Sequence, residues 1–174
     1  DHRDLHSFPT RRSSDLRYTA SRPGKQNLVF SYAPNPVSTG RMVADCRNGL
    51  LWDARLDNND MQYAIRIRAI NKGGSLSNEG GKLTVKGADE VVFLISADTD
   101  YKANNNPDYN DPKTYVGVDP LATTLDWVSK AEEKGYELLL DEHYRDYSNL
   151  FSRVSLILNN VNNDNDIPID QRLA

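Results

Sequence analysis

Apolar and polar side chains alternate most regularly in residues 61–70. One face of this segment is apolar, and the other carries Gln62, Arg66 and Arg68. A period of two is typical of a β-strand that buries one face. We therefore predict an antiparallel strand whose apolar face packs on a core and whose arginine face meets solvent. The apolar positions are Met61, Tyr63, Ile65, Ile67 and Ala69.

Further short apolar segments, separated by turn signals, predict more strands. The adjacent Gly80 and Gly81 can adopt positive φ angles at little cost, which favours a hairpin turn. Residues 91–97 are apolar on both faces, which indicates an interior strand. Turn signals about every 8–12 residues are typical of two packed sheets. The predicted strands are Asn27–Ser31, Gly49–Trp52, Ser75–Ser77, Lys82–Val85 and Val91–Ala97.

The strands are followed by a polar segment, Tyr101–Tyr115, which predicts an exposed loop. A helix is predicted after it, because Asp119 is a favourable N-cap and Pro120 suits the first turn. Gly135 is a favourable residue at which this helix ends. The predicted apolar stripe of the helix is Leu121, Leu125 and Val128.

A second helix is predicted from Tyr136 to Phe151, because its apolar residues recur at spacings of three and four. This broad apolar face must cover a sheet or the preceding helix. Alternation at Val154, Leu156 and Leu158 then predicts a return strand, and Asn159–Asp166 a polar loop. The predicted fold class is mainly β with α: an antiparallel super-β-sandwich followed by two helices that pack on it and a return strand.

Composition and charge exclude several classes of function. The formal net charge is -4 without a cluster of Lys and Arg, which argues against nucleic acid as a partner. No apolar run approaches the ~20 residues of a membrane span. Cys46 is the single cysteine, so an internal disulfide is excluded and a half-buried apolar role is expected for it. No cofactor is expected.

Residues Asp1–Leu16 read DHRDLHSFPTRRSSDL, which matches a common sequencing adapter translated in one frame. We therefore expect them to be a scar that is not structural. The native part is expected to begin near Arg17, inside a domain, so that a signal peptide would not be visible. His143 is then the one native histidine, which weakens the case for a transition metal.

Two acidic segments invite a functional interpretation, and a structural one is preferred for both. Asp98 and Asp100 flank Thr99 at a predicted strand end, where alternation puts both carboxylates on one side. Such a pair can raise one pKa and serve as acid and base, but solvated polar residues are common at strand ends. Asn162–Asp166 is rich in oxygen ligands but lacks the glycine and terminal glutamate of an EF-hand, so a polar loop is predicted.

Aromatic and histidine side chains form the other candidate groups. His143 lies on the apolar stripe of its helix, near Asp146 and Tyr147, and is predicted to be a buried, hydrogen-bonded packing residue rather than a base or a ligand. Four aromatic residues could form a platform on which sugars stack. Three come from the predicted loop and one from a helix, so the sequence does not establish a common plane. They are Tyr101, Tyr109, Tyr115 and Trp127.

Three blocks of sequence after residue 61 resemble a known family. The first is the predicted hairpin region Gly73–Val91, and the second is Leu94–Lys102 with its Ser-Ala-x-Thr-x-Tyr-Lys order. The third, His143–Leu173, has the order His-x-x-Asp-Tyr-x-x-Leu-Phe-x-Arg-Val-Ser-Leu and then x-Pro-x-Asp-x-Arg-Leu. In order and spacing they resemble the N-terminal β-sandwich and the junction behind it in glycoside hydrolase family 95, the α-L-fucosidase family.

The resemblance implies a secreted or periplasmic enzyme with an N-terminal super-sandwich, a helical linker and an (α/α)6 barrel. It implies hydrolysis of terminal α-linked L-fucose, or L-galactose in some members, with inversion by a general acid and a base-activated water. The family carries these groups in the barrel. No residue of this chain is therefore predicted to be catalytic, to bind a cofactor or to hold a metal, and the chain alone is expected to be inactive.

The expected domains follow from the resemblance. Residues 1–16 would be the scar, 17–168 a partial N-terminal β-sandwich domain with a helical insertion, and 169–174 the start of a linker to a missing catalytic barrel. The implied partners are that barrel and a fucosylated glycan bound by the parent enzyme, with no nucleic acid and no membrane span. Two alternatives stay open: a free-standing carbohydrate-binding β-sandwich, and a structural surface domain without a glycan ligand.

Overall fold

The computed structural model describes residues 2–7, 13–111 and 113–155. Within them, six strands form one antiparallel sheet in the order β1-β2-β9-β6-β5-β4, and three form a second antiparallel sheet in the order β3-β8-β7. The strands are β1 (His2–Ser7), β2 (Ser13–Thr19), β3 (Gln26–Ser31), β4 (Ser38–Ala44), β5 (Gly49–Leu56), β6 (Gln62–Lys72), β7 (Ser75–Glu79), β8 (Lys82–Ala88) and β9 (Glu90–Thr99). The helices are α1 (Pro120–Lys134) and α2 (Tyr136–Phe151).

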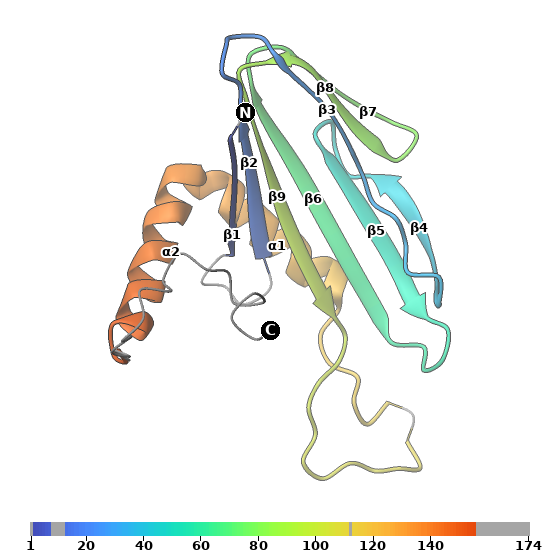
Figure 1. The fold of residues 1–174 in the computed structure, drawn as a ribbon. Coiled ribbons are helices and arrows are strands. Elements are labelled where there is room, and N and C mark those ends of the chain that lie inside the picture. The colour runs from blue at the N-terminus through green and yellow to red at the C-terminus, as the bar shows by residue number, and fades with distance from the viewer. Residues whose placement is uncertain (1, 8–12, 112, 156–174) are drawn as a thin grey trace, which may run out of the picture.

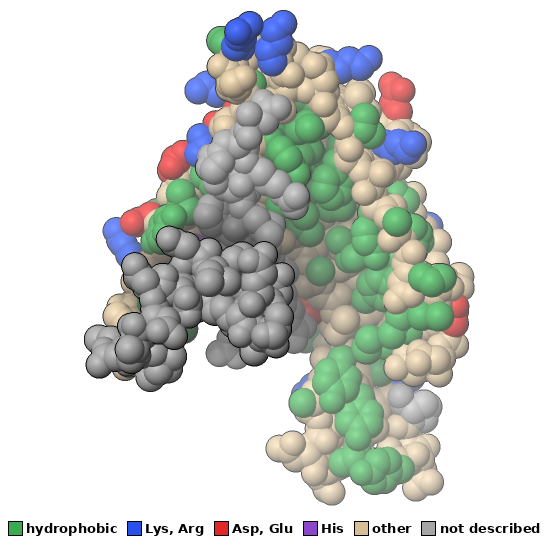
Figure 2. All heavy atoms as spheres, in the orientation of Figure 1, with side chains coloured by type: hydrophobic (Ala, Val, Ile, Leu, Met, Phe, Trp, Pro, Cys, Tyr) green, Lys and Arg blue, Asp and Glu red, His purple; other side chains and the backbone are tan. Residues whose placement is uncertain are grey.

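The elements stack in three layers, with the six-stranded sheet in the middle (Figure 1). The three-stranded sheet covers one face of this sheet, and α1 covers the other face over β6 and β9. The predicted fold class, antiparallel sheets in a sandwich with helices behind them, is confirmed at this level. Figure 2 shows hydrophobic side chains gathered along the six-stranded sheet and again on the loop below it.

Strand β9 explains how one sheet has a core on both of its faces. Val91 and Phe93 point into the sandwich, whereas Val92 and Leu94 point toward α1, as the alternation of a strand requires. The prediction of an interior strand over Val91–Ala97 is therefore confirmed. The sandwich core consists of Leu16, Leu50, Ile67, Ala69, Leu83, Val85, Ala88, Val91 and Phe93, and the helix-side core of Val92, Leu94, Val128, Ala131 and Leu139.

The predicted turn and cap residues have the expected conformations. Gly80 and Gly81 have φ angles of 58° and 73°, and they join β7 to β8 in a tight hairpin. The carboxylate of Asp119 accepts a hydrogen bond from the Leu121 N–H at 2.8 Å, and Pro120 is the first residue of α1. The helix ends at Gly135, as predicted, with φ at 73°.

The prediction that the arginine face of β6 meets solvent is wrong. Arg66 and Arg68 are 5% and 7% exposed, because α1 lies over the arginine side of the strand. The buried stripe of α1 also differs from the predicted one at one position, because Thr124 is buried and the predicted Leu125 is exposed. The hydroxyl of Thr124 donates to the carbonyl of Pro120 at 2.7 Å, so this buried polar group is satisfied inside the helix.

The second helix packs less than predicted. Leu139, in its first half, is buried against the helix-side core, but most of the apolar residues of the last two turns are exposed. The expectation that two helices pack on the sheet is therefore correct for α1 and for the first part of α2 only. The exposed aromatic and aliphatic residues of the last turns are Tyr144, Tyr147, Leu150 and Phe151.

The predicted return strand does not begin at Arg153, which lies in a turn, and Val154 is exposed outside any strand. The remainder of this predicted strand, residues 156–158, lies outside the described residues. The same holds for the predicted loop Asn159–Asp166 and for the expected linker, 169–174.

Residues 1–16, which the sequence analysis expects to be a scar, include described residues that lie in strands. Residues 2–7 form β1, and β2 pairs with β9 through Leu16 and Phe93. Asp15 and Leu16 are buried in that arrangement. An adapter origin for this segment stays a prediction.

The sequence analysis also missed β4, whose mixed apolar and polar residues occupy an edge of the six-stranded sheet.

Neither described helix has the length and apolar character that a membrane span demands.

Candidate functional site

A polar cleft of about 760 Å³ lies at the end of β9, where residues of the following loop and of the turn between β5 and β6 line it. The loop runs from residue 100 to residue 119 and extends past the sheet (Figure 1). The lining side chains combine aromatic, cationic and anionic groups. They include Arg55, Asp60, Gln62, Asp100, Tyr101, Lys113, Tyr115 and Asp119.

Backbone hydrogen bonds fix the base of this loop. The Lys102 N–H donates to the Tyr115 carbonyl at 2.7 Å, and an isolated bridge pairs Tyr101 with Val116. The Gly117 N–H donates to the Asp100 carbonyl, and a Cβ at Gly117 would lie 3.0 Å from the Lys102 side chain. Glycine therefore allows the two ends of the loop to approach closely. The segment predicted as an exposed loop is irregular as expected, but its two ends are joined.

The closed loop base brings two of the four predicted aromatic residues together. The rings of Tyr101 and Tyr115 stack at a centroid distance of 5.9 Å and an interplanar angle of 20°. Tyr109 lies on the same loop but is 85% exposed and does not line the cleft, and Trp127 lies on α1. Of the four aromatic residues considered for a sugar-stacking platform, two therefore lie together at the cleft, Tyr101 and Tyr115.

Hydrogen bonds also hold the polar side chains that line the cleft. Asp100 accepts from the Gln62 N–H at 3.1 Å, and Gln62 donates from its side chain to Asp53 at 3.2 Å. Arg55 donates to the Asp60 carbonyl at 3.0 Å. Asp60 adopts a φ of 56°, a left-handed conformation that aspartate tolerates better than most residues. These contacts orient the polar groups before any ligand arrives.

The two carboxylates predicted at the end of β9 face different hollows. Asp100 lines the polar cleft, whereas Asp98 is buried and lines a second hollow of about 400 Å³ together with Tyr32 and Tyr63. The strand ends at Thr99, so the alternation that would put both side chains on one face does not continue to Asp100. The structural interpretation of Asp98 and Asp100 stays a prediction.

His143 belongs to an aromatic row along the exposed part of α2. Its ring stacks on Tyr147 at 6.2 Å, and Tyr147 stacks on Phe151 at 5.2 Å. The residue is half-buried rather than buried, because the face of α2 on which it lies is largely open. Asn162–Asp166 lies outside the described residues. Within the described part of the chain, no group of three or more potential ligands is arranged to hold a metal ion.

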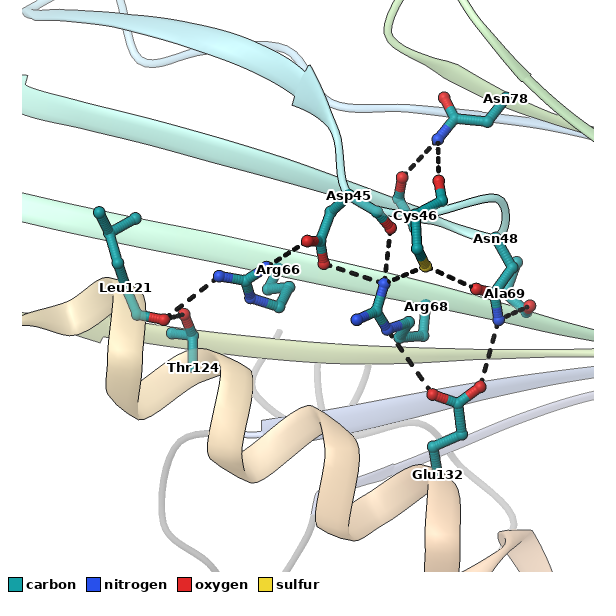
Figure 3. A network of polar contacts seen from close by, with 11 residues as sticks. Asp45, Cys46, Asn48, Arg66, Arg68, Ala69, Asn78, Leu121, Thr124 and Glu132 are labelled. Carbon is teal, nitrogen blue, oxygen red and sulfur yellow. Dashed lines mark hydrogen bonds and ion pairs between the residues drawn. The ribbon is translucent and has the colours of Figure 1, made fainter.

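An extended polar network lies under α1 and was missed by the sequence analysis (Figure 3). Asp45 forms ion pairs with Arg66 at 2.5 Å and with Arg68 at 2.9 Å. Arg66 also donates to the Leu121 carbonyl at 3.2 Å, and Arg68 lies 3.6 Å from Glu132. The network thus joins the loop after β4, the strand β6 and both ends of α1.

Cys46 has a different environment from the one predicted. It is exposed, has a φ of 59°, and its sulfur contacts the Arg68 guanidinium and the Asn48 side chain. Its role in the described structure is therefore a polar contact at the rim of this network (Figure 3). A glycine next to the network is also constrained: a Cβ at Gly49 would collide with the Asp45 carbonyl and the Arg68 guanidinium. No local pattern in the sequence signals these long-range contacts.

Comparison with known proteins matches most of the two sheets to a known domain family. The family model for the N-terminal domain of glycosyl hydrolase family 65 matches residues 16–104, which is more than half of the chain. This range includes every strand from β3 to β9 and ends inside the loop that forms the cleft. The similarity therefore begins well before residue 61, where the resemblance noted from the sequence starts.

Two similar proteins bear names that state an activity. A protein named probable alpha-fucosidase A, from Aspergillus niger, is 27% identical over 155 residues, which is 87% of this chain and 19% of that protein. A protein named alpha-L-fucosidase 2, from Arabidopsis thaliana, is 32% identical over 105 residues, which is 59% of this chain and 12% of that protein. The chain thus spans less than a fifth of the length of these relatives.

Proposed function

Because this chain belongs to the family of glycosyl hydrolase family 65 N-terminal domains, we propose that it serves as the non-catalytic N-terminal domain of an α-L-fucosidase-like glycoside hydrolase. The observation that carries the proposal is the overlap of two comparisons. The family model covers the strands β3 to β9, and the relatives named as fucosidases align over much of the same chain. The domain would therefore supply architecture, and catalysis would occur elsewhere in the protein.

The proposed reaction is hydrolysis of terminal α-L-fucosyl linkages with inversion. It requires a general acid at the leaving oxygen and a general base that activates water on the opposite face of the sugar. We place both groups in a barrel that would follow residues 169–174, with the protein secreted or periplasmic. The small share of the fucosidase relatives that this chain covers leaves room for such a barrel in a protein of their length.

The first prediction tests this division of labour. The protein that contains this chain and the proposed barrel should hydrolyse 4-nitrophenyl α-L-fucoside, whereas the 174-residue chain should release no nitrophenol above the buffer blank. We expect this difference because the general acid and the general base would both lie in the barrel. Proton NMR of the first sugar product should show the β-anomer, as inversion demands.

4-Nitrophenyl α-D-glucoside is the control substrate, and the longer protein should hydrolyse it poorly. Two outcomes would contradict two different parts of the proposal. Release of nitrophenol from the fucoside by the chain alone would refute the non-catalytic role. Absence of fucoside turnover by the longer protein, with a cooperative melting transition that shows it is folded, would refute the proposed activity.

We further propose that the open face of α2 packs against the barrel in the longer protein. This face carries the stacked rings of Tyr147 and Phe151 and the exposed Leu150. An exposed apolar row of this kind on a helix is a characteristic of interaction surfaces. It would complete the packing that α2 lacks on its own sheet.

The second prediction concerns the protection of this helix. Backbone amides of Tyr144–Phe151 should exchange with deuterium more slowly in the longer protein than in the 174-residue chain, by about tenfold or more, because burial suppresses local opening. Exchange measured by mass spectrometry on both proteins checks this. The β7–β8 hairpin, on the opposite side of the sheet, is the internal control and should exchange equally in both. Equal exchange at α2 would contradict the proposed contact.

A further inference from the structure

We propose that the polar cleft at the end of β9 is a binding site for a neutral saccharide. Its volume of about 760 Å³ lies within the ~300–1,000 Å³ of small-ligand sites. This inference goes beyond the proposed function, because it gives the domain a ligand contact of its own. It does not require that the bound sugar be cleaved.

Two aromatic rings line the cleft. Tyr101 and Tyr115 stack on each other, so each ring keeps one outer face that is not covered by the other. Tyr101 is 53% exposed and lines the cleft. Aromatic faces carry a partial negative charge, which attracts the C–H groups on the apolar side of a pyranose ring. The joined loop base holds this surface in place through the Lys102 and Tyr115 backbone bond at 2.7 Å.

Polar side chains line the cleft as well. Asp100 is anchored by the Gln62 N–H, and a carboxylate retains further lone pairs that can accept from hydroxyl groups. Arg55 donates to the Asp60 carbonyl at 3.0 Å and to the Gln62 side chain at 3.4 Å, and it pairs with the Asp60 carboxylate at 3.4 Å. A guanidinium has five N–H donors, so Arg55 can donate to a ligand as well. A saccharide hydroxyl both donates and accepts, so it can use both kinds of partner in the cleft. Because these groups are already oriented, binding would cost little side-chain ordering.

The charge of the lining selects among polar ligands. Asp60, Asp100 and Asp119 oppose Arg55 and Lys113, so the cleft has no excess of positive charge. A phosphate or sulfate would meet three carboxylates there, whereas an uncharged polyhydroxy ligand meets donors and acceptors without repulsion. The mixed lining therefore favours a neutral sugar over an anion.

The third prediction tests the site on the 174-residue chain itself. We expect 2′-fucosyllactose to bind with a saturable change in NMR chemical shifts or tyrosine fluorescence, and glucose 6-phosphate to give none. The fucosylated probe is chosen from the proposed function, so lactose and maltotriose are titrated as well. Tyr101→Ala should weaken binding about tenfold, and Tyr101→Phe should stay within about twofold of the parent chain, because the ring provides the contact.

Tyr109→Ala is the matched control, since it removes an exposed tyrosine of the same loop that does not line the cleft. It should leave the affinity unchanged, and all variants should keep the circular dichroism spectrum of the parent. Failure of all three neutral sugars to bind would overturn the inference. So would equal losses in Tyr101→Ala and Tyr109→Ala, or no loss in either. Binding is measured without turnover, so this result is independent of whether the longer protein cleaves fucosides.

Discussion

Asp45→Asn should destabilise the chain by about 3 kcal/mol. Asp45 is the shared ion-pair partner of Arg66 and Arg68, whose side chains are buried under α1. Removing one partner of a buried ion pair typically costs about 3–5 kcal/mol, because the remaining charge has lost both water and its partner. The lower end applies here, since the Asp45 side chain keeps partial access to solvent. Urea unfolding followed by circular dichroism measures the change as a lower midpoint at constant slope.

The matched control for this substitution is Asp126→Asn on the exposed face of α1. Asp126 pairs with Lys130 one turn away at 2.6 Å, and both side chains are largely exposed. Such a pair contributes only about 0.3–0.5 kcal/mol, so this variant should unfold almost with the parent. If Asp45→Asn costs no more than Asp126→Asn, then the Leu121 carbonyl and Glu132 suffice for the two arginines, and Asp45 does not fasten α1 to the sheet.

The arginine network marks the limit of what periodicity can predict. The alternation in β6 correctly placed Ile67 and Ala69 toward the sandwich core and the arginines on the other face. It could not show whether that other face meets water or a helix. An arginine can be buried when acidic partners are available, and here those partners are Asp45 and Glu132, both distant in sequence. Local patterns do not encode such pairing.

Local chemistry was predictable where a residue's own backbone preference decides the structure. The hairpin at Gly80 and Gly81 and the start of α1 at Asp119 follow from allowed φ angles and from one capping hydrogen bond. The candidate site was only partly predictable. Tyr101 and Tyr115 were recognised as aromatic residues of one loop, but their stacking depends on the backbone bridge that closes it. That bridge joins residues too far apart for any periodic signal.

Phe93→Ala should be the most damaging of the single core substitutions in the sandwich, with an expected loss of about 3–5 kcal/mol. Phe93 is 1% exposed at the centre of the six-stranded sheet. Its ring lies 4.9 Å from the Phe30 ring of the three-stranded sheet and meets the Tyr18 ring edge-on at 6.2 Å. The side chain therefore links both sheets, and its removal leaves a cavity that neither rigid sheet can easily close. Domains have total stabilities of about 5–15 kcal/mol, so a loss of this size removes a large part of the stability.

The control is a phenylalanine of the same chain outside the core. Phe151 is 67% exposed at the end of α2, so Phe151→Ala should change the free energy of unfolding of the 174-residue chain by less than about 1 kcal/mol. Thermal unfolding of both variants, monitored by circular dichroism, distinguishes them directly. Comparable losses in the two variants would mean that the contact between the sheets contributes no more than an exposed helical ring. In that case the two-sheet sandwich would not be the principal core of the domain.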